Sequence, residues 1–118
     1  MLKALLIFVL STNLSFALSK KSNVKDCKEK AKGDCLVFKG RARVYGKGTT
    51  RIWKVGSNRM YQVVSHTESA FNDLNHLSFS TQMFADYDVC LMKPETPSGY
   101  QDICVQAVKD AKTSAMPE

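Results

Sequence analysis

The sequence predicts a mainly β protein, a five-stranded OB-like barrel with the order β-β-β-α-β-β and one short helix, after an N-terminal signal peptide. Three features predict it: segments with alternating apolar and polar residues, one stretch with helical spacing, and four cysteines in a chain that begins like an exported protein. An open β-meander with a helix packed on one face is the competing arrangement. The length of 118 residues suits one domain.

The N-terminus has the three parts of a secretory signal peptide. Residues 1–3 include a positive charge, residues 4–10 are apolar, and residues 15–17 (Ser-Phe-Ala) place small side chains at the −3 and −1 positions of a cleavage site. The apolar run is much shorter than the roughly 20 residues of a membrane-spanning helix. No cysteine follows the cleavage site to accept a lipid. We therefore expect residues 1–17 to be removed, with no transmembrane segment after cleavage and a periplasmic or secreted location.

The rest of the chain divides into elements by its hydrophobic periodicity. Alternation predicts strands over residues 36–45, 50–56, 59–65, 85–92 and 102–108. Gly40, inside the first strand, predicts a bend or bulge. Residues 67–77 carry apolar side chains at spacings of four and three, which predicts a short helix with Thr67 as its N-cap. We expect a Lys-rich lead-in (18–34), a barrel-like domain (35–108) and a flexible polar tail (109–118).

The cysteines at positions 27, 35, 90 and 104 allow three pairings, among which sequence alone does not choose. Export favours disulfides over metal ligands, and no cofactor is expected. In a hairpin of the last two strands, setting Cys90 opposite Cys104 makes apolar residues face one another. The facing pairs are then Leu91 with Ile103, Val89 with Val105 and Tyr87 with Ala107. We therefore favour a Cys90–Cys104 bond, which leaves Cys27–Cys35 by elimination.

The charge is distributed unevenly along the chain. Residues 39–59 hold seven cations and no acid, whereas residues 60–118 hold three cations and eight acids. Arginines interleaved with aromatic residues suit an anionic ligand, because guanidinium groups pair with phosphate or sulfate and rings stack on sugars. The predicted ligand-binding residues are Lys39, Arg41, Arg43, Tyr45, Arg51, Trp53, Arg59 and Tyr61. In the alternative, Trp53 fills the core beside Val55 and the cations are solvated strand residues that discourage aggregation.

Candidate catalytic groups lack the motifs that would make them convincing. Asp86 and Asp88 lie on one strand face, and His66 and His76 flank the predicted helix, but no nucleophile motif or phosphate-binding loop accompanies them. The sequence therefore predicts a non-enzymatic binding module. The expected partner is an anionic glycan, lipopolysaccharide phosphate or an envelope protein, and export argues against nucleic acid. The alternatives are a structural or assembly partner in the cell envelope and, less favoured, a small hydrolase or inhibitor.

Two short patterns resemble a family of small exported bacterial proteins of uncharacterised function. Gly40-Arg41-x-x-x-Tyr45 and Arg51-Ile-Trp-x-x-Gly-x-x-Arg59 are similar to the core of that family. The cysteines at 90 and 104, each preceded by an aliphatic residue, resemble its C-terminal hairpin. Members usually have Asn-Gly and then Pro at the first turn, where this chain has residues 46–50 (Gly-Lys-Gly-Thr-Thr). The resemblance implies export and a compact domain, and it carries no activity with it.

Overall fold

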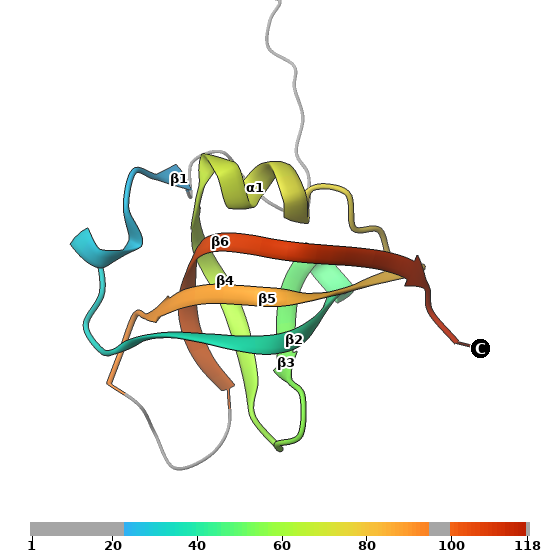
Figure 1. Ribbon diagram of the computed structural model, residues 1–118, viewed down its shortest axis with the longest axis horizontal. Coiled ribbons are helices and arrows are strands. Elements are labelled where there is room, and N and C mark those ends of the chain that lie inside the picture. The colour runs from blue at the N-terminus through green and yellow to red at the C-terminus, as the bar shows by residue number, and fades with distance from the viewer. Residues whose placement is uncertain (1–22, 95–99, 118) are drawn as a thin grey trace, which may run out of the picture.

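The computed structural model describes residues 23–94 and 100–117, and these form a mainly β structure with one α-helix (Figure 1). The strands are β1 (Asn23–Val24), β2 (Cys35–Tyr45), β3 (Thr49–Lys54), β4 (Met60–Thr67), β5 (Thr81–Leu91) and β6 (Tyr100–Ala115), and the helix is α1 (Glu68–Leu74). Within the described ranges, no helix is long and apolar enough to cross a membrane. The predicted signal peptide lies outside the described residues.

The five long strands pair in a ring. β2 pairs antiparallel with both β3 and β5, β3 pairs with β4, and β5 pairs with β6. The ring is completed by β4 and β6, which run parallel. The predicted order β-β-β-α-β-β is therefore confirmed for the long elements. The two-residue strand β1 lies in the predicted lead-in and pairs with the end of β4.

Gly40 serves close packing and is not a bulge. The register between β2 and β5 passes through Gly40 without a shift, and the regular pairing of β2 with β3 begins at Gly40. A Cβ atom at this position would lie 2.7 Å from Cγ2 of Ile52 and 3.0 Å from ring atoms of Phe38 and Tyr87. The missing side chain lets these three core residues approach the backbone of β2, which pairs there with strands on both sides.

The larger hydrophobic cluster of the described residues fills the space between the strands and α1. Every long strand and the helix contribute to it; its members include Phe38, Ala42, Ile52, Tyr61, Ala70, Leu74, Met83, Tyr87, Val89 and Ile103. The helix lies beside β6 (Figure 1) and begins as predicted at Thr67. The Thr67 hydroxyl accepts a hydrogen bond from the Ala70 amide (3.2 Å) and donates one to the Gln106 carbonyl (2.7 Å), so the N-cap also joins the helix to β6.

The predicted polar tail is instead part of the sheet. β6 is 16 residues long and continues to Ala115, which pairs with Thr81 at the start of β5. Residues 109–115 are exposed, which explains their polar composition. The prediction failed because β5 begins four residues earlier than expected and supplies backbone partners that a periodicity argument did not anticipate.

The predicted disulfide pairing is wrong, although the register behind it is partly right. The bonds are Cys27–Cys104 and Cys35–Cys90. Cys90 of β5 does lie opposite Cys104 of β6, as predicted. On its other side, however, Cys90 also lies opposite Cys35 of β2. A register shift between Asp88 and Val89 also moves Tyr87 opposite Val108 instead of Ala107. Two disulfides fit an oxidising environment outside the cytoplasm.

Candidate functional site

Six of the eight predicted binding residues share the outer face of β2 and β3. Alternate side chains of β2 point outward because Ala42 and Val44 between them are buried. The antiparallel register places Arg41 opposite Trp53 and Arg43 opposite Arg51. The six residues are Lys39, Arg41, Arg43, Tyr45, Arg51 and Trp53. The alternation of the sequence was therefore sufficient to find most of this face.

Trp53 lies on the outer face beneath a cation. The guanidinium carbon of Arg41 lies 4.8 Å from the centroid of the Trp53 ring. The indole N–H donates a hydrogen bond to the Ser57 carbonyl (2.7 Å) in the turn after β3. The ring is half-buried and fixed in orientation by this bond. Of the two sequence interpretations of Trp53, the structure therefore favours the outer position over the core.

Arg51 lies between two aromatic rings. Its guanidinium carbon is 4.9 Å from the ring centroid of Tyr45 and 4.4 Å from that of Tyr100. Nη1 of Arg51 also donates to the Tyr100 hydroxyl at 3.2 Å. Tyr100 is 56% exposed and was not predicted. It reaches this face through the parallel pairing that sets it opposite Met60, a long-range contact for which the sequence carries no local signal.

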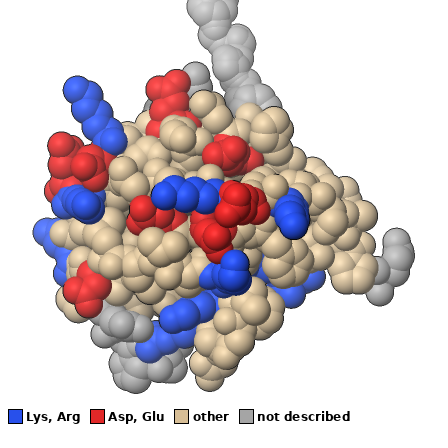
Figure 2. Space-filling view, viewed as in Figure 1, with Lys and Arg blue, Asp and Glu red and all other residues tan. Residues whose placement is uncertain are grey.

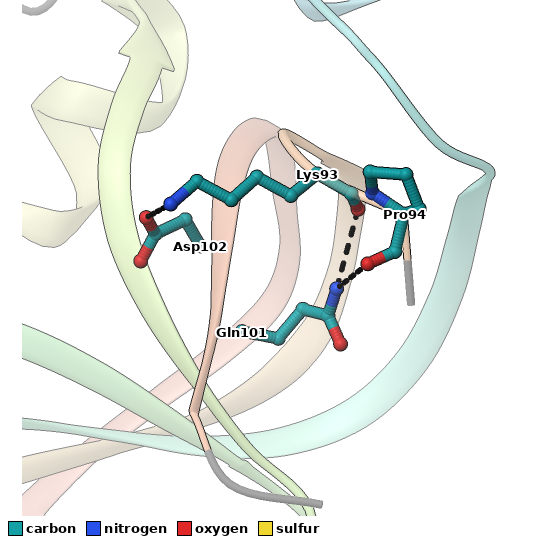
Figure 3. Close-up of polar contacts among 4 residues, drawn as sticks. All are labelled: Lys93, Pro94, Gln101 and Asp102. Carbon is teal, nitrogen blue, oxygen red and sulfur yellow. Dashed lines mark hydrogen bonds and ion pairs between the residues drawn. The ribbon is translucent and has the colours of Figure 1, made fainter. Parts of the chain in front are cut away.

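Beside Tyr100, contacts join the start of β6 to the residues that follow β5 (Figure 3). The buried side chain of Gln101 donates from Nε2 to the carbonyl oxygens of Lys93 (3.2 Å) and Pro94 (3.0 Å). Nζ of Lys93 also lies 3.7 Å from Oδ2 of Asp102. This exposed ion pair contributes little energy, but the Gln101 bonds join the two sides of the loop between β5 and β6. They anchor Gln101, the residue next to Tyr100.

The acids in the described part of the chain do not neutralise the guanidinium groups on this face. Among the described residues, neither Arg41, Arg43 nor Arg51 forms an ion pair with a carboxylate. Arg43 donates from Nε and Nη2 to Oε1 of Gln82, at 3.0 and 2.7 Å. Nε of Arg41 and Nε of Arg51 are buried, and within residues 23–94 and 100–117 neither has a hydrogen-bond partner. We call the residues that combine these features the arginine–aromatic ladder: Arg41, Tyr45, Arg51, Trp53 and Tyr100.

Three predicted binding residues lie elsewhere or are otherwise engaged. Tyr61 is only 1% exposed and stacks on Phe38 with 5.1 Å between ring centroids, so its prediction as a ligand-binding residue is wrong. It lies opposite Ile52, an inward position, and its aromatic character alone does not reveal the face. Arg59 belongs to the turn between β3 and β4. Lys39 lies at the edge of the outer face and pairs with Asp86 at 3.1 Å.

The candidate catalytic residues do not converge on one site. His66 is fully buried against Phe71, and no described residue forms a hydrogen bond with either of its ring nitrogens. Burial lowers the pKa of His66, since the charged imidazolium would lose its hydration. Asp86 and Asp88 lie half-exposed on the outer face of β5. Within residues 23–94 and 100–117, no group of three or more His, Cys, Asp or Glu is placed to hold a metal ion.

No protein-family model, curated protein or solved structure matches this chain.

Proposed function

We propose that the protein is a non-enzymatic binding module of the periplasm or the secreted fraction, and that the ladder contacts an anionic partner such as envelope glycan or lipopolysaccharide phosphate. The observation that carries this proposal is the environment of the Arg41 and Arg51 guanidinium groups. Both are stacked on aromatic rings, and neither pairs with a carboxylate of the described residues.

This arrangement favours a ligand role for physical reasons. Stacking fixes the plane of a guanidinium group while leaving N–H groups at its edge, so less conformational entropy is lost when an anion binds. Cation–π contacts at exposed positions contribute only about 0.5–1 kcal/mol each to stability, which makes stability a weak reason to keep them. The remaining donors match the oxygens of phosphate, sulfate or carboxylate.

The fold gives a second reason to expect ligand binding at this surface. We propose that the ring of strands is an OB-like barrel, in which the face of the second and third strands binds oligosaccharides or oligonucleotides. The corresponding strands here are β3 and β4, and β3 carries Arg51 and Trp53. This is an analogy of fold, and it supports the place of binding more than the identity of the ligand. Predicted export and the two disulfides favour a glycan over a nucleic acid.

Calorimetric titration with heparin at increasing sodium chloride tests the proposal. We expect the affinity to fall steeply with salt, because the contacts are between exposed charges. Arg41→Ala and Arg51→Ala should each lower the affinity about tenfold, the effect of losing charge-assisted hydrogen bonds. Arg41→Lys keeps the charge but not the planar fork and should recover only part of this loss. As a control, Lys30→Ala removes one exposed cation from the segment before β2 and should have little effect.

Binding that does not depend on salt, or that survives both arginine substitutions, would contradict the proposal. Capture of one stoichiometric envelope protein, without affinity for heparin, would favour the alternative role of an assembly partner.

A further inference from the structure

A groove lies beside the ladder, where β2, β5 and β6 meet on the outer side of the sheet. Its volume is about 570 Å³. The side chains that define it are Lys39, Val55, Phe84, Asp86, Asp110 and Lys112. Two of them, Val55 and Phe84, are large apolar residues that are 43% and 40% exposed. Neither belongs to the hydrophobic core, so both side chains are available for contact with a ligand.

An irregularity in β6 forms one wall of the groove. Phe84 pairs with Lys112 whereas Asp86 pairs with Lys109, so one residue of β5 opposes two residues of β6. The extra residue is accommodated at Asp110, which has a left-handed backbone conformation (φ 55°). Bulges of this kind bend a strand and redirect its side chains, and they are frequent beside binding sites. Here the bulge places Asp110 and Lys112 along the groove.

The groove differs from the ladder in its charge. Nζ of Lys39 pairs with Asp86 at 3.1 Å, and Asp110 and Lys112 add one charge of each sign. Figure 2 shows acidic and basic side chains side by side over β5 and β6. The carboxylates of Asp86 and Asp110 would repel an anion in the groove. A plain hydrocarbon is also disfavoured, because it would remove water from the charged side chains around it. An uncharged sugar ring suits both features, since its C–H face packs on Phe84 and its hydroxyls bond donors and acceptors alike.

The groove and the ladder form one continuous row across the sheet. Successive register pairs join Phe84 to Arg41 and Arg41 to Trp53. With neighbouring strands ~4.8 Å apart, these two steps span roughly 10 Å along the sheet surface. Such a row is longer than one sugar ring and offers positions of different charge along its length.

From this geometry we propose that the groove is a subsite for an uncharged sugar, next to the ladder that binds anionic groups. The ligand is then an oligosaccharide in which acidic and neutral residues adjoin. The inference rests on the proposed function of the ladder and adds to it the class of ligand and a second group of contacts, centred on Phe84.

Two probes separate the subsites. Hyaluronan oligosaccharides alternate a uronate with an uncharged N-acetylhexosamine, whereas linear polyphosphate has charge and no sugar. By calorimetry we expect the affinity for hyaluronan to rise more than tenfold from the disaccharide to the hexasaccharide. Phe84→Ala should lower the hexasaccharide affinity about tenfold and leave polyphosphate binding unchanged. Phe79→Ala is the matched control, because Phe79 is 63% exposed and lies outside the groove.

The outcomes distinguish this inference from the function on which it rests. If polyphosphate binds through Arg41 and Arg51 but Phe84→Ala leaves the hexasaccharide affinity unchanged, the groove is not a sugar subsite and the ladder proposal stands. An equal affinity for disaccharide and hexasaccharide would overturn the extended site in the same way. If neither probe binds at low salt, the ladder proposal fails and the groove proposal fails with it. Melting curves of both Phe variants establish that they are folded.

Discussion

The two ends of β2 are held in different ways. At its first residue, Cys35 is bonded to Cys90 of β5, and the neighbouring Cys27–Cys104 bond attaches the segment before β2 to β6. At the other end, Tyr45 and the arginines before it make ring contacts and hydrogen bonds at the surface. Disulfides typically contribute about 2–4 kcal/mol each, several times more than an exposed cation–π contact. Stability is therefore concentrated at the cystine end and the proposed binding chemistry at the arginine end.

The largest expected effect comes from removing a covalent bond at the cystine end. Cys27 and Cys104 are 77 residues apart in sequence, and by the loop-entropy argument their bond stabilises the fold by about 4 kcal/mol. The double variant Cys27→Ser/Cys104→Ser should lose about this free energy of unfolding, measured in urea. Its affinity for heparin, measured where the variant is still folded, should change less than twofold, because four of the five ladder residues lie on β2 and β3, away from this bond.

The matched control is Cys35→Ser/Cys90→Ser, for which a similar loss is expected from a separation of 55 residues. Peptide mapping without reduction tests the pairing itself. A peptide joining Cys90 to Cys104 would contradict the structure and restore the pairing inferred from the sequence. A heparin affinity that falls in step with stability would show that the two ends are not independent.

A smaller loss of stability is expected where β2 contacts strands on both sides. Gly40→Ala introduces a Cβ that would lie 2.7 Å from Ile52 and 3.0 Å from Phe38 and Tyr87. Overpacking of a filled core costs about 1–3 kcal/mol, which urea unfolding would resolve. Gly46→Ala is the matched control, since nothing lies within 4 Å of the Cβ position there and its loss should be small. Equal losses in the two variants would show that close packing at Gly40 is not important.

The same comparison shows what the sequence reveals and what it does not. At the arginine end, strand alternation predicted which side chains of β2 and β3 share the outer face, because that information is local to each strand. Tyr100 was missed because its neighbour Arg51 reaches it only through the parallel pairing of β4 and β6. Tyr61 was assigned to the wrong face because aromatic residues serve cores and ligand sites equally well.

At the cystine end, the sequence predicted the right pair of facing residues and the wrong bonds. Cys90 has a cysteine opposite it on each side, and only the arrangement of three strands and the preceding segment shows which one it bonds. The helix start at Thr67 was predictable because an N-cap depends on a few adjacent residues. Features set by local sequence were therefore recovered, whereas those set by strands meeting across the ring were not.

The smallest effect is a pH dependence that should be confined to stability. His66 is buried in β4 beside β1, and burial lowers the pKa of its imidazole below the ordinary value of 6.5. Below pH 6.5 the unfolded chain therefore binds a proton that the folded protein does not. The free energy of unfolding should fall by at most about 1.4 kcal/mol for each pH unit in this window, and not change through His66 above about pH 7.5.

Urea unfolding between pH 5.5 and 8 tests this expectation. His66→Phe should flatten the curve because the titrating group is removed. Arginines stay charged throughout this range, so heparin affinity should not follow the stability. If His66→Phe keeps the wild-type slope, a group other than His66 causes the pH dependence of stability. If the affinity titrates together with stability, the cystine and arginine ends are coupled, and the separation of roles along β2 is wrong.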